Sequence, residues 1–180
     1  MRGSLTEYAL QSAVKAALCN FLSALRLPLG YLLFGATARF DLFAAGVVLA
    51  LVALSDILDG HLARYWRVES RFGAWLDVFA DGAAILAALS ALAYRGVVGW
   101  WLPVLILGML GQFVLTSGHR PIYDPLGKYY GGALFLGLGG YILFPDPVML
   151  LGFQAAAVCL SAVTLTTRLA PATARKRDLV

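Results

Sequence analysis

The sequence predicts an all-α integral membrane protein in which six transmembrane helices follow a short amphipathic helix. Hydrophobic residues make up 61% of the 180-residue chain, and the mean hydropathy is +0.79. Charged residues make up only 13%, about half the share that is typical of a soluble domain. Polar segments divide the apolar sequence into runs of about 20 residues, the length that an α-helix needs to cross a bilayer. We therefore expect one membrane domain over residues 1–180.

The first predicted element, residues 4–17, is an amphipathic helix that lies in the membrane interface. Glu7, Gln11 and Lys15 recur every four residues on one side of it, and the segment is too short to cross the bilayer. The predicted transmembrane helices are residues 18–36, 42–64, 72–94, 98–117, 129–144 and 147–167. The domain thus consists of an interfacial helix at 1–17, a six-helix bundle at 18–169 and a basic tail at 170–180 that we expect to be frayed.

Basic residues are distributed unequally between the two ends of the predicted bundle. Twelve lie toward one end, whereas only Arg39 and Arg95 lie toward the other. Cytoplasmic loops of membrane proteins are enriched in Lys and Arg, so both termini are predicted to face the cytoplasm. The net charge of +4 is therefore attributed to topology and anionic lipids rather than to nucleic acid binding. The twelve residues are Arg2, Lys15, Arg26, Arg64, Arg67, Arg71, Arg120, Lys128, Arg168, Arg175, Lys176 and Arg177.

Four of the ten acidic residues lie in one short stretch. Asp56 and Asp59 are three residues apart, and Asp77 and Asp81 are four apart, so each pair shares a face of its helix. A polar turn at 64–71 lets the two helices point all four carboxylates into one pocket. Clustered carboxylates repel one another unless cations neutralise them, and all-oxygen ligands suit Mg²⁺ or Mn²⁺. The stretch predicts a site for two divalent ions; the alternative is a set of acidic caps at helix ends.

The residues around the aspartates complete a longer pattern. Gly60 and Gly73 lie where a large ligand can approach the backbone, and Arg64, one turn beyond Gly60, can contact a phosphate oxygen. The full pattern is D-x2-D-G-x2-A-R-x8-G-x3-D-x3-D, and with it the chain resembles the CDP-alcohol phosphotransferase family. It matches the family signature at every fixed position, namely Asp56, Asp59, Gly60, Ala63, Arg64, Gly73, Asp77 and Asp81.

The resemblance implies an enzyme that transfers a phosphatidyl group from CDP-diacylglycerol to an alcohol and releases CMP. It implies two Mg²⁺ or Mn²⁺ ions held by the four aspartates, and it assigns Asp81 as the general base for the acceptor hydroxyl. A homodimer in a membrane of the bacterial inner-membrane type is also implied. The expected CDP-binding residues are Asn20, Ser23, Asp56, Gly60, Ala63, Arg64 and Gly73.

Asn20, Ser23 and Arg26 form the motif N-x2-S-x2-R at the start of the first predicted transmembrane helix. The resemblance places this face beside the nucleotide site, where Asn20 and Ser23 contact the donor or support the metal cluster. The alternative is a polar helix end whose arginine extends toward the lipid headgroups.

The acceptor is expected to contact the predicted polar loop at 119–128, through His119, Arg120 and Lys128. Arg and Lys suit a phosphorylated acceptor, and Gly127-Lys128 resembles the family branch that makes phosphatidylglycerophosphate from glycerol 3-phosphate. Gly82 departs from that branch, which usually has lysine there, so inositol phosphate or phosphatidylglycerol stays open as acceptor. The same three cations are alternatively only topological charges.

A cation-coupled transporter is the alternative from another functional class, because it also places carboxylates inside the membrane. It predicts acidic residues near the bilayer midplane and broken helices. In this sequence the acidic residues lie at helix ends beside a basic turn, and this favours the enzyme.

Overall fold

The computed structural model describes the backbone of residues 2–117 and 125–177, and the side chains of residue 7 and of residues 10–117 and 129–167. These residues form six α-helices and contain no β-strand. The helices are α1 (Arg2–Ala38), α2 (Leu42–Trp66), α3 (Arg71–Tyr94), α4 (Trp101–Ser117), α5 (Pro125–Leu143) and α6 (Pro147–Arg177). The all-α prediction is confirmed.

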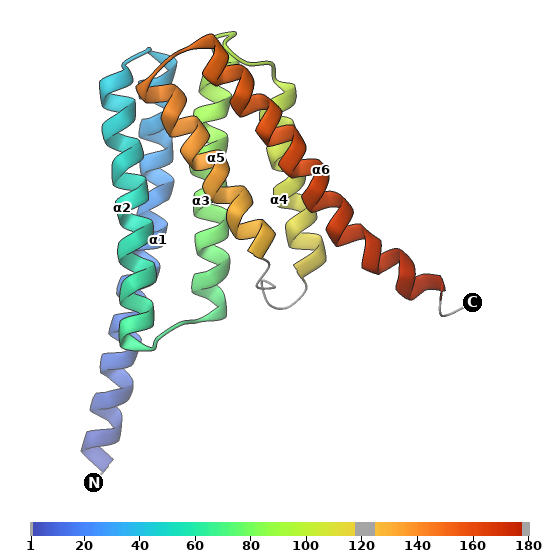
Figure 1. Ribbon diagram of the computed structural model, residues 1–180. Helices are drawn as coiled ribbons and strands as arrows, with labels where there is room; N and C mark the ends of the chain where they lie inside the picture. The colour runs from blue at the N-terminus through green and yellow to red at the C-terminus, as the bar shows by residue number, and fades with distance from the viewer. Residues whose placement is uncertain (1, 118–124, 178–180) are drawn as a thin grey trace.

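Consecutive helices run in alternating directions between two ends of the molecule (Figure 1). Helix α1 packs against both α2 and α3, and α5 contacts α2, α3 and α6. Helix α6 leans away from the other helices along its C-terminal half (Figure 1). The N-terminus, the α2–α3 connection, the end of α4 and the start of α5 all lie toward the lower end in that view.

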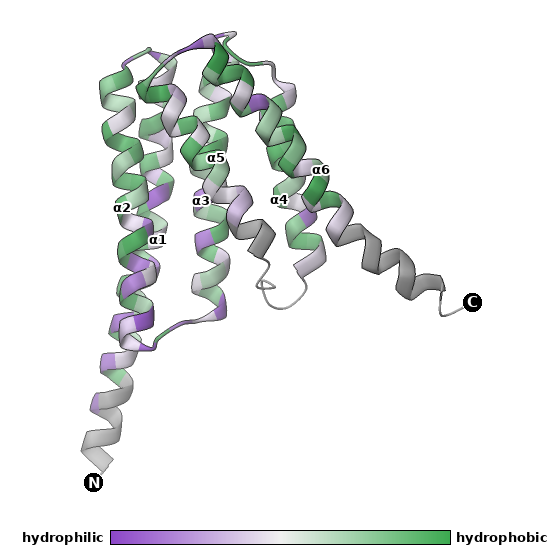
Figure 2. Cartoon of the chain, viewed as in Figure 1, coloured by the Kyte–Doolittle hydropathy of each residue, from purple (hydrophilic) through white to green (hydrophobic). Residues whose placement is uncertain are grey.

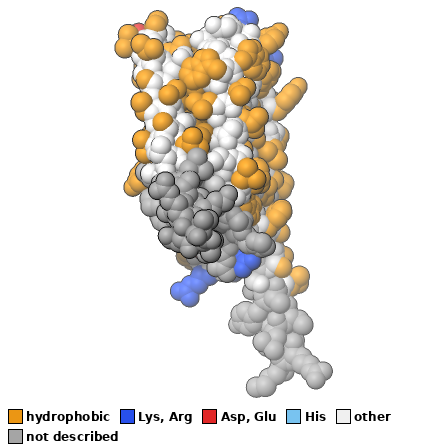
Figure 3. Space-filling view, turned by 90° about the vertical axis from the view of Figure 1, so that its right-hand side faces the viewer, with side chains coloured by type: hydrophobic (Ala, Val, Ile, Leu, Met, Phe, Trp, Pro, Cys, Tyr) orange, Lys and Arg blue, Asp and Glu red, His pale blue; other side chains and the backbone are white. Residues whose placement is uncertain are grey.

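The surface is that of a membrane protein. Among the described residues, four helical segments are long and apolar enough to cross a bilayer, namely Leu10–Ala38, Leu42–Trp66, Arg71–Tyr94 and Pro147–Thr167. Two shorter apolar helices, Trp101–Ser117 and Tyr129–Leu143, run beside them. Hydrophobic residues are frequent along the coloured parts of the helices (Figure 2). On the face in Figure 3 their side chains are spread over the upper part and along the right-hand edge, with Lys and Arg at the top and near the bottom.

Small residues bring α1 and α3 close together. Ala80, Ala84 and Ala88 of α3 are buried, and a Cβ added to Gly30 of α1 would lie 3.4 Å from the Ala84 Cα. Close backbone approach of this kind is typical of membrane helices, where van der Waals packing replaces the hydrophobic effect. Buried residues of α1 form an inward-facing stripe that recurs at alternating intervals of four and three. They are Cys19, Ser23, Arg26, Gly30, Leu33 and Thr37, and all are buried.

Three boundary predictions are wrong. The separate interfacial helix at 4–17 does not exist, because α1 is continuous from Arg2 to Ala38, and no Gly or Pro stands between Ser4 and Leu27 to end it. The predicted loop at 119–128 ends earlier, because Pro125, which suits a first helical position, begins α5. The tail at 170–180 is helical as far as Arg177.

Candidate active site

A short connection between α2 and α3 determines how far along its helix each of the four aspartates lies. Arg67 ends α2 in the left-handed conformation (φ 56°), and its N–H donates to the Ala63 and Arg64 carbonyls. Ser70 caps α3, with its hydroxyl oxygen accepting from the Gly73 N–H at 2.9 Å. The two helices therefore run antiparallel from a short turn. Asp59 and Asp77 each lie about two helical turns from the connection, and Asp56 and Asp81 about three.

The four carboxylates meet around the guanidinium of Arg26 from α1. Nη1 donates to Asp56 Oδ1 at 3.1 Å and also to Asp81 Oδ1. Nη2 donates to Asp77 Oδ1 at 2.9 Å and also to Asp59 Oδ2. The Arg26 side chain is 0% exposed. The predicted convergence of the aspartates is thus confirmed, with an arginine at its centre.

Arg26 is the residue at this site to which the sequence pattern assigns no role of its own. The alternative of an arginine extending toward the headgroups is wrong, because Arg26 lies in the inward-facing stripe of α1. Within the described residues it forms all the ion pairs that the four aspartates make. The signal was available in the sequence, since Arg26 shares the heptad-like spacing of Cys19, Ser23 and Gly30.

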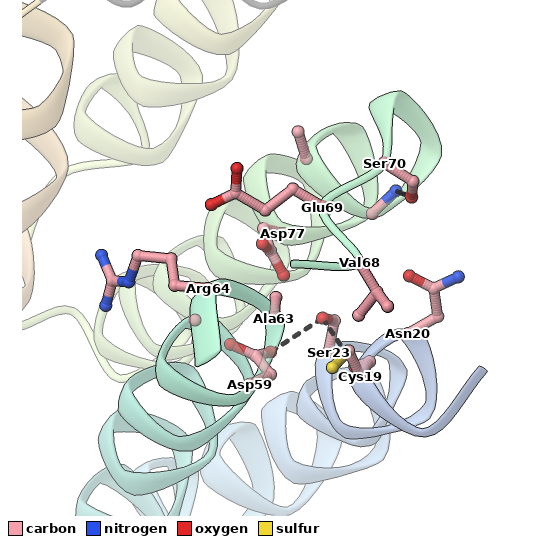
Figure 4. Close-up of a pocket in the computed structure, with 13 residues that line it drawn as sticks. Cys19, Asn20, Ser23, Asp59, Ala63, Arg64, Val68, Glu69, Ser70 and Asp77 are labelled. Carbon is pink, nitrogen blue, oxygen red and sulfur yellow. Dashed lines mark hydrogen bonds between the residues drawn. The ribbon is translucent and has the colours of Figure 1, made fainter. Parts of the chain in front are cut away.

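Ser23 supports the cluster directly. Its hydroxyl donates to Asp59 Oδ2 at 2.7 Å (Figure 4). Asp59 is the most enclosed of the four carboxylates, with a side chain only 3% exposed, whereas Asp56, Asp77 and Asp81 are partly exposed. The expectation that Ser23 supports this cluster agrees with the contact.

A cleft of about 290 Å³ opens beside the cluster, between α1, the α2–α3 connection and the start of α3. Of the predicted CDP-binding residues, all but Asp56 line it: Asn20, Ser23, Gly60, Ala63, Arg64 and Gly73. Asp59 and Asp77 also line it, so the cleft reaches the carboxylates. Arg64 lies at its rim on the side opposite Asn20 (Figure 4). The lining residues missed from the sequence are Cys19, Val68, Glu69, Ser70 and Ala74.

The two motif glycines serve different purposes. A Cβ on Gly73 would lie 2.9 Å from Asn20 Oδ1 and 3.1 Å from Ser70 Oγ, so a side chain here would displace the Asn20 amide and crowd the Ser70 cap. A Cβ on Gly60 would meet only the end of the flexible Arg64 side chain, at 3.7 Å. Packing within the described residues therefore does not require Gly60, and its place in the cleft agrees with close approach of a ligand.

The carboxylates suit hard divalent cations. The ligand set is all oxygen, and Asp59 Oδ1 is buried with no hydrogen-bond partner among the described residues, a costly state unless another group engages it. With Arg26 between the carboxylates, no three acidic, His or Cys side chains of the described residues surround one point at metal-ligand spacing. The residues thus fit a divalent ion in chemistry, provided that the guanidinium moves.

The predicted acceptor residues lie largely outside the described part of the chain. His119 and Arg120 are in the segment that is not described, and Lys128 is in the first turn of α5 with its side chain undescribed. Helix α4 ends and α5 begins at the same end of the molecule as the α2–α3 connection (Figure 1).

The helical bundle is apolar outside, and charged side chains are buried between three of its helices beside a polar cleft. These features define an integral membrane protein with an internal polar site. The chain belongs to the CDP-alcohol phosphatidyltransferase family, whose sequence model matches residues 16–168. The family expected from the aspartate pattern is confirmed.

Curated relatives agree with this assignment. The chain is 31% identical over 102 residues to the CDP-diacylglycerol--glycerol-3-phosphate 3-phosphatidyltransferase of Escherichia coli (strain K12). The same values hold for the proteins of that name from Escherichia coli O157:H7 and Shigella flexneri serotype 5b. The match covers 57% of this chain and 56% of each relative, so it spans about half the length of the curated relatives.

Proposed function

We propose that this chain transfers a phosphatidyl group from CDP-diacylglycerol to glycerol 3-phosphate and releases CMP. The observation that carries the proposal is the convergence of Asp56, Asp59, Asp77 and Asp81 beside a cleft lined by the other motif residues. The family match and the names of the curated relatives support this chemistry. Nothing in them supports a cation-coupled transporter, and α2 and α3 are unbroken through the aspartate positions.

The reaction is a displacement at the phosphorus that carries diacylglycerol. The acceptor hydroxyl oxygen forms a bond to this phosphorus, the bond to the bridging oxygen of CMP breaks, and its electron pair leaves with CMP. Asp81, which is partly exposed, accepts the hydroxyl proton as general base. The cleft holds the cytidine diphosphate next to the carboxylates, with Arg64 at the rim available to a phosphate oxygen.

Two Mg²⁺ or Mn²⁺ ions are part of the proposal. Asp56, Asp59, Asp77 and Asp81 would hold them, and when bound they would supply positive charge to the pyrophosphate and the leaving CMP. Two observations support this assignment: the all-oxygen ligand set, and the buried Asp59 Oδ1, which has no hydrogen-bond partner within the described part of the chain.

The acceptor is tested by a competition between alcohols. Purified protein is incubated with labelled CDP-diacylglycerol and equal concentrations of glycerol 3-phosphate, inositol phosphate and phosphatidylglycerol. We expect phosphatidylglycerophosphate as the main product, in agreement with the relatives' names and with Gly127-Lys128. A main product made from either competitor would assign the chain to another acceptor while keeping the chemistry.

All six helices are proposed to cross the membrane, with the active site and both termini on the cytoplasmic side. Helices α4 and α5 have 17 and 19 residues, so they extend about 26–28 Å, close to the hydrocarbon thickness. Arg26 does not belong in the count of basic residues, because it is buried among carboxylates. Eleven basic residues still lie toward one end and two toward the other. The homodimer that the resemblance implies is retained as part of this proposal.

Topology is tested with epitope tags in intact cells. Tags at the two termini should stay inaccessible to a membrane-impermeant antibody until the membrane is permeabilised, because both termini lie at the basic end. A tag inserted in the α3–α4 connection is the matched control and should be detected in intact cells. Detection of either terminal tag from outside would contradict the six-span topology.

The basic residues near the start of α5 are proposed to select the acceptor. Replacing Arg120 or Lys128 with Ala should raise the KM for glycerol 3-phosphate about tenfold to a hundredfold, since a charge-assisted contact contributes about 1.5–3 kcal/mol. The KM for CDP-diacylglycerol should change little, and Arg39→Ala, a charge removed at the opposite end, should change neither. A shift confined to the donor KM would assign these residues to the wrong substrate.

A further inference from the structure

We propose that Arg26 is the resident counter-ion of the metal-free active site and that a divalent cation binds by displacing its guanidinium. The inference rests on the proposed metal centre and adds a step to it, in which divalent ions from solution replace the Arg26 guanidinium. It assigns to α1, outside the aspartate motif, a residue that sets the affinity of the site for metal.

The contacts of Arg26 leave little room for a second cation among the same oxygens. Each Nη atom contacts two carboxylates, one from α2 and one from α3, so the guanidinium links both helices to α1. Every motif aspartate directs one oxygen at it. An ion that binds the four carboxylates together must therefore compete for these oxygens.

The charges at the site favour metal ions that replace the guanidinium over metal ions that bind beside it. Four carboxylates and one guanidinium leave three negative charges uncompensated, so the metal-free cluster still attracts cations. Two divalent ions neutralise the four carboxylates without Arg26. With the guanidinium still in place the site would carry an excess positive charge, and like charges at contact distance repel each other.

The hydrogen bonds of Arg26 within the described residues are all at the tip of its side chain. Both Nη atoms are paired, but the buried Nε has no hydrogen-bond partner in the part of the chain that the structure describes. An arginine has several rotatable bonds, and no hydrogen bond of Nε in the described residues has to break for the guanidinium to withdraw. When it does, Asp59 Oδ1 and Oδ2 both become available to a metal, with Ser23 still donating to Oδ2.

The test measures metal affinity in the absence of substrate. Mn²⁺ binding to the detergent-purified chain is followed by the electron paramagnetic resonance signal of free Mn²⁺, for the wild type, Arg26→Gln and Arg26→Lys. We expect Arg26→Gln to bind Mn²⁺ on the order of tenfold more tightly, because a competing charge is gone. The Mn²⁺ affinity of Arg26→Lys should lie between those of the wild type and Arg26→Gln, because a lysine ammonium cannot bridge both carboxylate pairs as a guanidinium does. Arg39→Gln, the matched control, should bind like the wild type.

Thermal unfolding provides a second readout. In EDTA, Arg26→Gln should unfold at a lower temperature than the wild type, since its carboxylates have no counter-ion, and saturating Mg²⁺ should raise its midpoint by more than it raises that of the wild type. If Arg26→Gln does not fold even with Mg²⁺, Arg26→Lys decides the question by the same two measurements.

The outcomes separate this inference from the proposed function. Mn²⁺ affinity that is unchanged or weaker in both Arg26 variants, with a wild type that binds Mn²⁺, overturns displacement and leaves the metal centre intact. A wild type that binds no Mn²⁺ overturns the metal centre and the exchange together.

Discussion

Replacing Asp59 with Asn is expected to lower phosphatidyl transfer by about 10³-fold or more. In the proposed mechanism the Asp59 carboxylate helps to hold the two divalent ions. Losing a charge-stabilising group of this kind from the transition state costs about 4 kcal/mol. The variant should still fold, because Arg26 keeps Asp56, Asp77 and Asp81 as partners. Initial rates with CDP-diacylglycerol and glycerol 3-phosphate measure the effect, and Ala at Asp56, Asp59 or Asp77 should give the same loss.

Asp41→Asn is the matched control for this prediction. Asp41 caps α2 at the other end of the helix by accepting from the Ala44 N–H at 3.0 Å, and Asn preserves a cap of this kind. Its activity should therefore be close to that of the wild type. An Asp59→Asn protein that is folded in detergent and retains more than about a tenth of the wild-type rate would show that Asp59 does not hold a catalytic metal.

Removing divalent metal is expected to abolish turnover. Excess EDTA should reduce the rate to background, and Mg²⁺ or Mn²⁺ added beyond the chelator should restore it, because the clustered carboxylates and the pyrophosphate need compensating positive charge. The protein should stay folded in EDTA, since Arg26 pairs with the four carboxylates when no metal is bound. A thermal scan of the EDTA-treated sample provides this control. Full turnover in excess EDTA would contradict a metal-dependent mechanism.

The aspartate site was predictable because its information is local in the sequence. Fixed intervals within one helix place Asp56 with Asp59 and Asp77 with Asp81, and a short turn between the helices leaves only an antiparallel arrangement. The helices themselves follow from apolar runs of bilayer length. The structure confirms these elements with shifts of a few residues at most of their ends.

The role of Arg26 depends on helix packing, which the local sequence indicates only weakly. An arginine near a helix end can extend to the membrane surface or turn inward, and the choice depends on which face of α1 meets α2 and α3. That face is marked by the small residues Gly30 and Ala84, whose contact belongs to two distant segments. The interval of three from Asn20 through Ser23 to Arg26 obscured the inward-facing stripe, which alternates between intervals of four and three.

Helix ends were the least predictable part of the fold. Polar side chains at Glu7, Gln11 and Lys15 suggested a separate interfacial helix, yet polarity does not end a helix when no Gly or Pro intervenes. Pro125 lies within the polar segment 119–128, which predicts a loop, yet at the first turn of a helix the missing N–H of proline has no cost.

The most direct test of the proposed activity follows the phosphorus of the donor. CDP-diacylglycerol labelled only at the phosphorus attached to diacylglycerol is incubated with purified protein, Mg²⁺ and glycerol 3-phosphate. If the acceptor hydroxyl attacks that phosphorus, all transferred label appears in phosphatidylglycerophosphate, and unlabelled CMP is released in equal amount. Label in the released nucleotide, or no lipid product from a folded, metal-loaded protein, would contradict phosphatidyl transfer by this chain.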